Sequence, residues 1–345
     1  MGVAISELLV FKPIAIEDLS GKVLAVDAYN VLYQFLSSIR SQDGSLLMDS
    51  QGRVTSHLMG LFTRFSRLLE YNIKLVFVFD GKVPDLKRKE QERRHELKVE
   101  AEKQFEAAKE VEDVEAMKKF AARTSRLTLD MVEEAKKLLA AMGIPHFIAP
   151  SEGEAQASFI VKQGDAYALV SQDADCFLFG APRYIKNLTL SEKRKKIGRL
   201  AYEKVVPELL SLSDNLNNLG MDHDQFIALA MLIGTDYNIG GIKGIGPKKA
   251  VGLVKLYGHD FDRLFSEAKW SDFFTVSWKE VFDTFKNIPV SKNYRLDWRE
   301  VDEAAVLKLL VEEHGFSRER ILSTLEKLGK SPAKTQKGLT DFFKG

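Results

Sequence analysis

Four carboxylates follow two apolar runs of the chain and could together bind a cation. They are Glu152, Glu154, Asp173 and Asp175. The two runs, residues 144–149 and 166–170, predict buried strands, and open α/β sheets bind their ligands at the carboxyl ends of the strands. Acids crowded at such an edge repel one another and cost stability unless divalent ions neutralise them. This part of the sequence therefore predicts a metal site.

Helix capping is the alternative explanation for part of this cluster. Ser151 and Glu154 have the spacing of a capping box, and acids in the first turn of a helix interact favourably with the helix dipole. Glu154 alone therefore has a structural explanation. Capping requires neither Glu152 nor Asp175, and for this reason we favour the metal site.

Two other segments repeat the pattern of an apolar strand that ends in an acid. Residues 22–27 end at Asp27, and residues 73–80 end at Asp80. A single Asp after a strand is usually a turn residue or a helix cap. Strands that alternate with helices are, however, parallel neighbours, and the ends of parallel strands meet at one edge of the sheet. The repetition therefore predicts that these acids converge on the first four.

Asp236 is a further candidate for the same cluster. It follows an apolar helix, residues 226–233, whose start has the capping-box form with Asp222 and Gln225. Asp236 is either a simple helix-end residue or, if the helix points at the same edge, the seventh acid of the site.

The segment from residue 82 to residue 142 is charged and rich in helix formers. Between Pro84 and Gly143 it contains neither Gly nor Pro, and it has few apolar positions before residue 121, so we expect a pair of helices that projects into solvent. Cations follow the Asp80 strand end closely, at Lys87, Arg88, Lys89, Arg93 and Arg94. They form either a solvated charged face or a phosphate site beside the metal. Residues 127–142 regain helical apolar spacing and return to the core.

A glycine-rich turn, GIKGIGPKKA at residues 241–250, opens another helix. It lacks the Walker spacing and the strand that precedes a dinucleotide-binding turn, so nucleotide binding is a weak prediction. The free amides at a helix start bind anions, and Lys243, Lys248 and Lys249 add charge suited to a nucleic-acid backbone. Short Gly turns are structural in most proteins, but these basic flanks favour phosphate binding. The basic stretch at residues 185–204 is consistent with a solvated loop.

The composition describes a globular protein without an obvious partner. The chain has 345 residues, 45% of them hydrophobic and 29% charged, and a net charge of +1. No apolar run approaches the roughly 20 residues of a membrane helix, and the start lacks an export signal, so we expect a soluble protein, cytosolic or nuclear. Cys176 is the only cysteine, which excludes an internal disulfide and a zinc site built from several thiolates.

The end of the chain is a polar linker, residues 329–338, followed by a segment with two aromatics. Aromatic side chains on a disordered tail are unusual unless they dock on a partner. We therefore expect residues 336–343 to act as a peptide anchor.

The sequence resembles the flap endonucleases of archaea and eukaryotes across nearly its whole length. The matching motifs are VDAYNVLYQFL, DSQGRVTSHLMGLF, VFVFDGKVPDLK, MGIPHFIAPSEGEA, SQDADCFLFG, IGTDY, GIKGIGPKKA and QKGLTDFF. The resemblance implies an α/β fold with a parallel-rich central sheet flanked by helices, a projecting helical arch and a helix-two-turn-helix motif. It implies an N-terminal nuclease region at residues 1–99, which includes the base of the arch, and places the rest of the arch at residues 100–126. An internal nuclease region with the helix-two-turn-helix motif follows at residues 127–258. The chain then continues with a C-terminal helical region at residues 259–328 and a flexible tail at residues 329–345.

The resemblance also implies roles for individual residues. The metal ligands are Asp27, Asp80, Glu152, Glu154, Asp173, Asp175 and Asp236. Catalytic roles fall to Asp175 and to the cations Lys87 and Arg94. The DNA-binding residues are Tyr33, Arg40, Arg64, Glu152, Gly234, Asp236, Lys243, Gly244, Gly246, Lys248 and Lys249. The sliding clamp (PCNA) is bound by Gln336, Leu339, Phe342 and Phe343.

The implied activity is hydrolysis of phosphodiester bonds at a 5′ flap or a 5′ end, in DNA replication and base-excision repair. Two Mg²⁺ ions, replaceable by Mn²⁺ and about 3.5–4 Å apart, would stabilise the attacking hydroxide and the leaving 3′ oxygen. The expected substrate is flapped or nicked duplex DNA, bound by a monomer. No basic extension follows the clamp motif, so we expect an archaeal protein, cytoplasmic and associated with the nucleoid, and a nuclear one only if the source is eukaryotic. The alternatives are another metal nuclease that cuts junctions, bubbles or RNA, and a non-catalytic DNA-binding protein tethered to the clamp.

Overall fold

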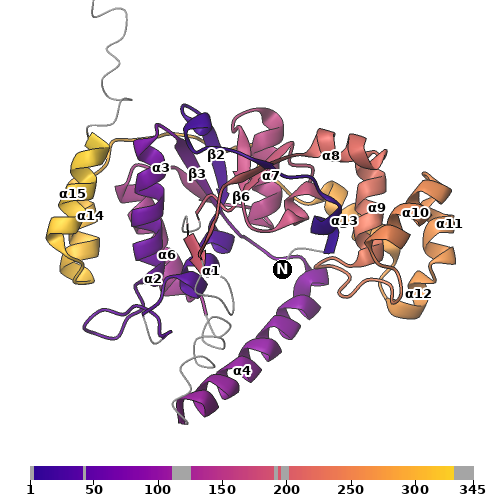
Figure 1. Cartoon of the computed structure of the whole chain (residues 1–345), viewed down its shortest axis with the longest axis horizontal. Coiled ribbons are helices and arrows are strands. Elements are labelled where there is room, and N and C mark those ends of the chain that lie inside the picture. The colour runs from indigo at the N-terminus through magenta and orange to yellow at the C-terminus, as the bar shows by residue number, and fades with distance from the viewer. Residues whose placement is uncertain (1–3, 42–43, 111–125, 190–192, 196–201, 330–345) are drawn as a thin grey trace, which may run out of the picture.

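A mixed, mostly parallel seven-stranded sheet forms the centre of the molecule (Figure 1). The computed structural model describes residues 4–41, 44–110, 126–189, 193–195 and 202–329. The strands are β1 (Lys12–Pro13), β2 (Val23–Asp27), β3 (Lys74–Phe79), β4 (His146–Ile148), β5 (Ala168–Val170), β6 (Arg183–Lys186) and β9 (Glu208–Ser211), in the spatial order β1-β9-β6-β5-β2-β3-β4. The neighbours from β6 to β4 are parallel, whereas β9 is antiparallel to β6 and β1. A separate hairpin pairs β7 (Lys193–Lys195) with β8 (Tyr202–Lys204). The predicted α/β class is confirmed.

The central strands are buried on both faces, and this explains their continuous apolar sequences. Ala25 and Val76 point into one hydrophobic core, while Val26 and Phe77, their sequence neighbours, point into a second. Side chains alternate across a strand, so a strand between two helical layers needs apolar residues at every position. The predicted strands at residues 22–27, 73–80, 144–149 and 166–170 are all present, each trimmed at one or both ends.

Helices cover both faces of the sheet. The first core is formed with η1 (Ala4–Leu8), α7 (Gly153–Gln163), α8 (Leu212–Leu219), α9 (His223–Ile233), α10 (Pro247–Tyr257), α11 (Phe261–Glu267), α12 (Trp270–Phe273) and α13 (Trp278–Asn287). The second is formed with α1 (Ala28–Ser38), α2 (Ser56–Gly60), the π-helical turn η3 (Leu61–Phe65), α3 (Ser66–Glu70), α6 (Leu129–Ala141), α14 (Glu303–Leu307), the π-helical turn η6 (Lys308–Glu313) and α15 (Arg318–Gly329). Figure 1 shows α14 and α15 at one end of the molecule and α10 to α12 at the other. Among the described residues, no helix combines the length and apolar character that a membrane span requires.

One long charged helix, α4 (Arg88–Glu110), projects from the body of the protein (Figure 1). It follows a single turn, η4 (Asp85–Lys87), after the end of β3. This confirms the prediction of a projecting helix, because a sequence with so few apolar positions has no face to bury. The second helix of the predicted pair falls largely on residues 111–125, outside the described residues.

The C-terminal part differs from the helical region expected at residues 259–328. Residues 288–302 form neither helix nor strand and connect α13, on one core, with α14, on the other. Trp298 donates its indole N–H to the carbonyl of Leu75 in β3 at 2.8 Å, and the amide of Arg299 donates to the carbonyl of Gly143 at 3.0 Å. This segment therefore joins the two helical layers around the β3–β4 side of the sheet.

A buried ionic chain ties the loop before α2 to α6 and to the residues after η6. Nδ1 of His314 lies 3.0 Å from Asp49, and its Nε2 lies 3.3 Å from Glu134. The other carboxylate oxygen of Glu134 lies 3.0 Å from Nε2 of His57, whose side chain is fully buried. Arg53 completes the chain with a contact of 2.8 Å to Asp49. Because four segments meet here, the chain fixes this loop relative to the C-terminal helices.

We expect the Asp49 carboxylate to stabilise the fold at neutral pH but not in acid. Burial alone would raise the pKa of Asp49, but hydrogen bonds from the Arg53 amide and from His314 outweigh it and lower the pKa from 3.8 to about 2. A carboxylate whose pKa is lower in the folded state stabilises the fold at pH values above its ordinary pKa. This stabilisation is lost as the pH falls through the pKa of the folded state. Asp49→Asn should therefore lower the melting temperature at pH 7, with a difference from wild type that shrinks between pH 4 and pH 2. A difference independent of pH would contradict this.

Candidate active site

The predicted acids lie at one edge of the sheet because parallel strands end there. Asp27 is the last residue of β2, and Asp80 follows β3 directly. Glu152 follows β4, and Asp173 follows β5. Since β2 to β5 are parallel neighbours, their carboxyl ends share this edge. Asp236 reaches it from the C-terminal end of α9.

The pKa shifts show that the acids act on one another. Burial, followed by the charge of Asp80, raises the pKa of Asp27 to about 7. Burial and then the charges of Asp173 and Asp27 raise the pKa of Glu154 well above its ordinary value. Each carboxylate is thus disfavoured as an anion by desolvation and by its neighbours.

The same repulsion extends to the acids from η5 (Ala174–Phe177) and from the end of α9. Burial raises the pKa of Asp175 well above its ordinary value, and the charges of Asp173 and Asp236 raise it further. The pKa of Glu152 is raised by burial and also by Asp80 and Asp236. All seven predicted acids therefore belong to one electrostatic cluster.

The capping-box explanation for Glu154 is wrong. Helix α7 begins at Gly153 with Glu152 as its N-cap residue, and no side chain caps it. The amide of Gly153 instead donates to Oδ1 of Asp80 at 2.6 Å. Any side chain at Gly153 would crowd this bond, since its Cβ would lie 2.9 Å from the same oxygen. Glu154 is left to face the acid cluster.

Two of the acids do cap helices in addition to lying in the cluster. Asp27 accepts a hydrogen bond from the amide of Asn30 at 3.0 Å, and Asp173 accepts one from the amide of Asp175 at 3.2 Å. The cap explains the local turn after each strand. The predicted capping box at the start of α9 is present, formed by Asp222 and Gln225.

Lys87 and Arg94 extend from the base of α4 into the acid cluster. Nζ of Lys87 lies 3.0 Å from Oε1 of Glu152 and 3.2 Å from Oδ2 of Asp236. Nη2 of Arg94 donates to both oxygens of Asp236 at 2.9 Å. Burial would lower the pKa of Lys87, but Glu152 and Asp236 outweigh it and raise the pKa above its ordinary value. Both side chains are therefore charged beside the acids, as a phosphate site requires.

The donor set of the cluster suits a hard divalent cation. Carboxylate oxygens are the preferred ligands of Mg²⁺, and Oδ1 of Asp175 is buried without a hydrogen-bond partner. In the described part of the chain, no three His, Cys, Asp or Glu side chains converge closely enough to hold a metal ion as they lie. Lys87 and Arg94 occupy oxygens of Glu152 and Asp236 in this arrangement. The residues fit the predicted ions chemically, and the ligand assignment stays a prediction.

The predicted DNA contacts around the arch lie on separate elements. Tyr33, on α1, is 38% exposed, and Nζ of Lys98 on α4 lies 4.7 Å from its ring centre. Arg40 follows α1 and donates from Nη1 to the carbonyl of Gly44 at 2.8 Å. Arg64 is half-buried in η3. Tyr33 therefore lies in the space between α1 and the arch helix.

The glycine-rich turn connects α9 to α10 through a close approach of two backbones. Gly234 has a φ of 117°, and a Cβ there would lie 2.5 Å from the amide nitrogen of Gly241. Gly246 is the N-cap residue of α10, which starts at Pro247 without a side-chain cap. The predicted backbone-binding residues, all exposed, are Lys243, Gly244, Gly246, Lys248 and Lys249. The turn thus exposes its lysines beside a helix start that no side chain caps.

Glu90 and Lys98 are two residues of this site that no sequence motif indicates. Glu90 is only 3% exposed and bonds Arg94, whereas Lys98 lies against Tyr33. Their signal in the sequence is i,i+4 spacing from Arg94. Within a segment where most residues are charged, this spacing does not distinguish them from solvated pairs.

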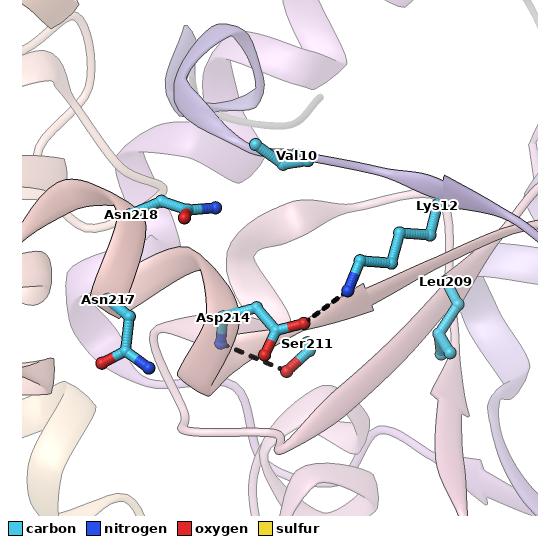
Figure 2. Close-up of a pocket in the computed structure, with 7 residues that line it drawn as sticks. All are labelled: Val10, Lys12, Leu209, Ser211, Asp214, Asn217 and Asn218. Atoms are coloured by element: carbon cyan, nitrogen blue, oxygen red, sulfur yellow. Dashed lines mark hydrogen bonds and ion pairs between the residues drawn. The ribbon is translucent and has the colours of Figure 1, made fainter.

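A polar pocket elsewhere on the surface contains none of the predicted site residues (Figure 2). It has a volume of about 370 Å³ and is lined by residues of three segments: Val10 to β1, β9 and α8. Nζ of Lys12 contacts Oδ2 of Asp214 there at 2.8 Å, as Figure 2 shows.

The predicted clamp contacts lie outside the described residues. They are Gln336, Leu339, Phe342 and Phe343.

The fold and the acidic edge together define the class of protein. Residues 3–101 match the family model of the XPG N-terminal domain, and residues 143–236 match that of the XPG I-region. These two ranges contain all seven acids as well as Lys87 and Arg94. The sheet has the PIN/5′-nuclease fold, and the family is one of nucleases that hydrolyse phosphodiester bonds.

Full-length relatives define the family more closely. The chain is 48% identical over 345 residues, 100% of both chains, to Flap endonuclease 1 of Pyrococcus furiosus. It is similar to the structure of flap endonuclease-1 from Methanococcus jannaschii, with a TM-score of 0.76, 40% identity and coverage of 96% of this chain and 99% of that one. The catalytic core of Rad2 in complex with DNA substrate follows with a TM-score of 0.68, 27% identity and coverage of 92% and 96%. The chain belongs to the flap endonuclease family, and the resemblance seen in its sequence is confirmed.

Proposed function

We propose that this protein cuts DNA at 5′ flaps and 5′ ends in a Mg²⁺-dependent reaction, in replication and repair. The observation that carries the proposal is the cluster of seven acids at one sheet edge, with Lys87 and Arg94 bonded into it. Acids from distant parts of a chain are not brought together at this cost without a cation to neutralise them. Cations beside them favour a substrate with a phosphate group.

The seven acids of the cluster would hold the metal ions, and the resemblance to the family implies two such ions. The ligands are Asp27, Asp80, Glu152, Glu154, Asp173, Asp175 and Asp236. Such ions supply activation of the water nucleophile and stabilisation of the leaving oxygen. Lys87 and Arg94 bind the non-bridging oxygens of the scissile phosphate and offset the charge that develops there. Tyr33 stacks against the terminal nucleotide, which must unpair before its phosphate reaches the buried edge.

Cleavage of end-labelled substrates tests the function directly. A 5′-flap duplex, a Holliday junction, a bubble and single-stranded RNA are compared, with Mg²⁺, with Mn²⁺ and with a chelator. The proposal expects cleavage of the flap at the junction with either metal, and none with the chelator. Preferential cutting of the junction, the bubble or RNA would favour another metal nuclease. Binding without cleavage of any substrate would favour a clamp-tethered binding protein.

The α10 turn grips the backbone of the duplex and sets the salt dependence of binding. Each phosphate neutralised by a lysine contributes about 0.9 to the slope of log K against log salt concentration. The double variant Lys248→Ala/Lys249→Ala should therefore weaken binding and reduce this slope by up to about 1.8, while single-turnover cleavage at saturating DNA stays near wild type. Lys255→Ala, exposed in the last turn of the same helix, is the control. An unchanged slope in the double variant would exclude this contact.

The tail residues 336–343 anchor the enzyme to the sliding clamp. The support is their resemblance to the family's clamp motif, with Gln336, Leu339, Phe342 and Phe343 at its key positions. Phe342→Ala/Phe343→Ala should abolish stimulation of cleavage by an archaeal clamp. Cleavage without the clamp should be unaffected, because no predicted active-site residue lies in this segment. Full stimulation of the variant would contradict the anchor.

A further inference from the structure

The first turn of α4 contains a buried acid on an otherwise solvated helix. Glu90 is 3% exposed, although the helix around it is charged and projects away from the sheet. Its carboxylate accepts hydrogen bonds from two arginines. Oε2 accepts from Nε of Arg93 at 2.7 Å, and Oε1 accepts from Nη2 of Arg93 at 2.7 Å and from Nε of Arg94 at 2.6 Å.

These bonds determine which way the Arg94 guanidinium faces. Glu90 takes the Nε edge of Arg94, so the Nη edge is left to point away from the helix. That edge reaches Asp236, 142 residues later in the chain, with Nη2 at 2.9 Å from both carboxylate oxygens. Arg94 is thus held on both sides, by its own helix and by the acid cluster.

Orientation of an arginine matters for catalysis because the guanidinium acts through a planar fork of donors. A long side chain free in solvent must lose its rotamer freedom each time it binds a phosphate. A side chain already held in the productive direction has lost this freedom in advance. The partner that holds it then contributes to the rate without contacting the substrate.

We propose that Glu90 is a positioning residue for the hydrolysis reaction, because it holds Arg94 with its donor edge turned into the active site. This inference rests on the proposed function, in which Arg94 binds the scissile phosphate. Arg93, bonded to both oxygens of Glu90, fixes the carboxylate in turn.

A purely structural role is the competing explanation, and the same helix offers a control for it. An acid in the first turn stabilises a helix through its dipole, and i,i+4 pairs add a small amount. Glu92 forms such a pair with Arg88 at 3.3 Å, but both side chains are largely exposed, at 63% and 79%, and the pair does not reach the acid cluster. Glu92→Gln therefore removes a comparable pair without touching the active site.

The experiment is a double-mutant cycle in the full-length protein with a 5′-flap substrate and Mg²⁺. Glu90→Gln should lower kcat by about 10–100-fold, by analogy with the loss of a partner that orients a metal ligand. KM and the melting temperature should stay near the wild-type values, and Glu92→Gln should cut normally. In an Arg94→Ala background, Glu90→Gln should cost no more than about 2-fold, because residues that act as a unit are not additive.

A second readout follows the arginine itself in the metal-free protein. The ¹⁵N NMR signal of the Arg94 Nε–Hε group should be protected from solvent exchange in wild type and in Glu92→Gln, and should lose this protection in Glu90→Gln. A normal kcat in Glu90→Gln overturns the inference and leaves the proposed function standing. So does a loss of kcat on Glu90→Gln that is as large in the Arg94→Ala background as in wild type. Normal turnover in Arg94→Ala overturns the inference together with the proposed role of Arg94.

Discussion

Replacing Asp175 by alanine should lower flap cleavage by more than about 10³-fold, since removal of a single oxyanion donor already costs about 10²–10³. Asp175 is buried, its Oδ1 has no hydrogen-bond partner, and the charges of Asp173 and Asp236 act on it. Its loss removes a proposed metal ligand. Binding of flap DNA should persist, because the predicted backbone contacts of the α10 turn are intact.

Metal-linked stability provides an independent measure of the same ligand. A ligand that binds only the folded protein raises its melting temperature, so Mg²⁺ should stabilise wild type more than Asp175→Ala. The variant should not lose stability without metal, since burial and repulsion disfavour the Asp175 carboxylate there. Asp283→Ala, exposed on α13, is the control. Near-normal turnover of Asp175→Ala with Mg²⁺ would falsify the metal assignment.

Loss of Lys87 should lower kcat by about 10²–10³-fold, the effect of removing one charged donor from a developing oxyanion. The ammonium lies among Glu152 and Asp236, and its raised pKa keeps it charged at every pH at which the enzyme works. Lys87→Ala should leave KM nearly unchanged, because many other contacts bind the duplex. Single-turnover cleavage of the flap substrate measures the effect.

Lys82→Ala is the matched control for this change, since Lys82 is exposed in the loop that precedes Lys87. It should cut at the wild-type rate. Lys87→Ala should also destabilise the metal-free protein, because Glu152 and Asp236 lose a neutralising charge. If Lys87→Ala raised KM and left kcat unchanged, Lys87 would contribute to ground-state binding and not to the transition state.

The strand-end acids could be predicted from the sequence because the signal for each is local. An apolar run followed by Asp27, Asp80 or Asp173 needs only a short window to be recognised. The convergence of these ends also follows, because strands that alternate with helices form parallel neighbours. The helix from residue 223 to residue 233, with its capping box, belongs to the same group.

Other features depended on contacts between distant segments. The letters Ser-x-x-Glu at residue 151 allow a capping box, but α7 begins with Glu152 as its N-cap residue, and the amide of Gly153 donates to Asp80, which follows another strand. The segment at residues 288–302 has no periodic pattern, and it is held by bonds to β3, to the end of α6 and to Gln156 in α7. The buried chain of Asp49, His57, Glu134 and His314 joins residues up to 265 positions apart.

The sequence alone determined the α/β class, the identity of the acids and the position of the cations, because these follow from short-range patterns and from motifs that keep their order along the chain. Only the tertiary structure decided which oxygens meet which cations. A carboxylate such as Glu90 looks like a solvated surface charge until the fold places it beside Arg93 and Arg94 and buries it. Burial and pairing depend on the distances between side chains in the folded protein, and the spacing of residues along the chain does not specify them.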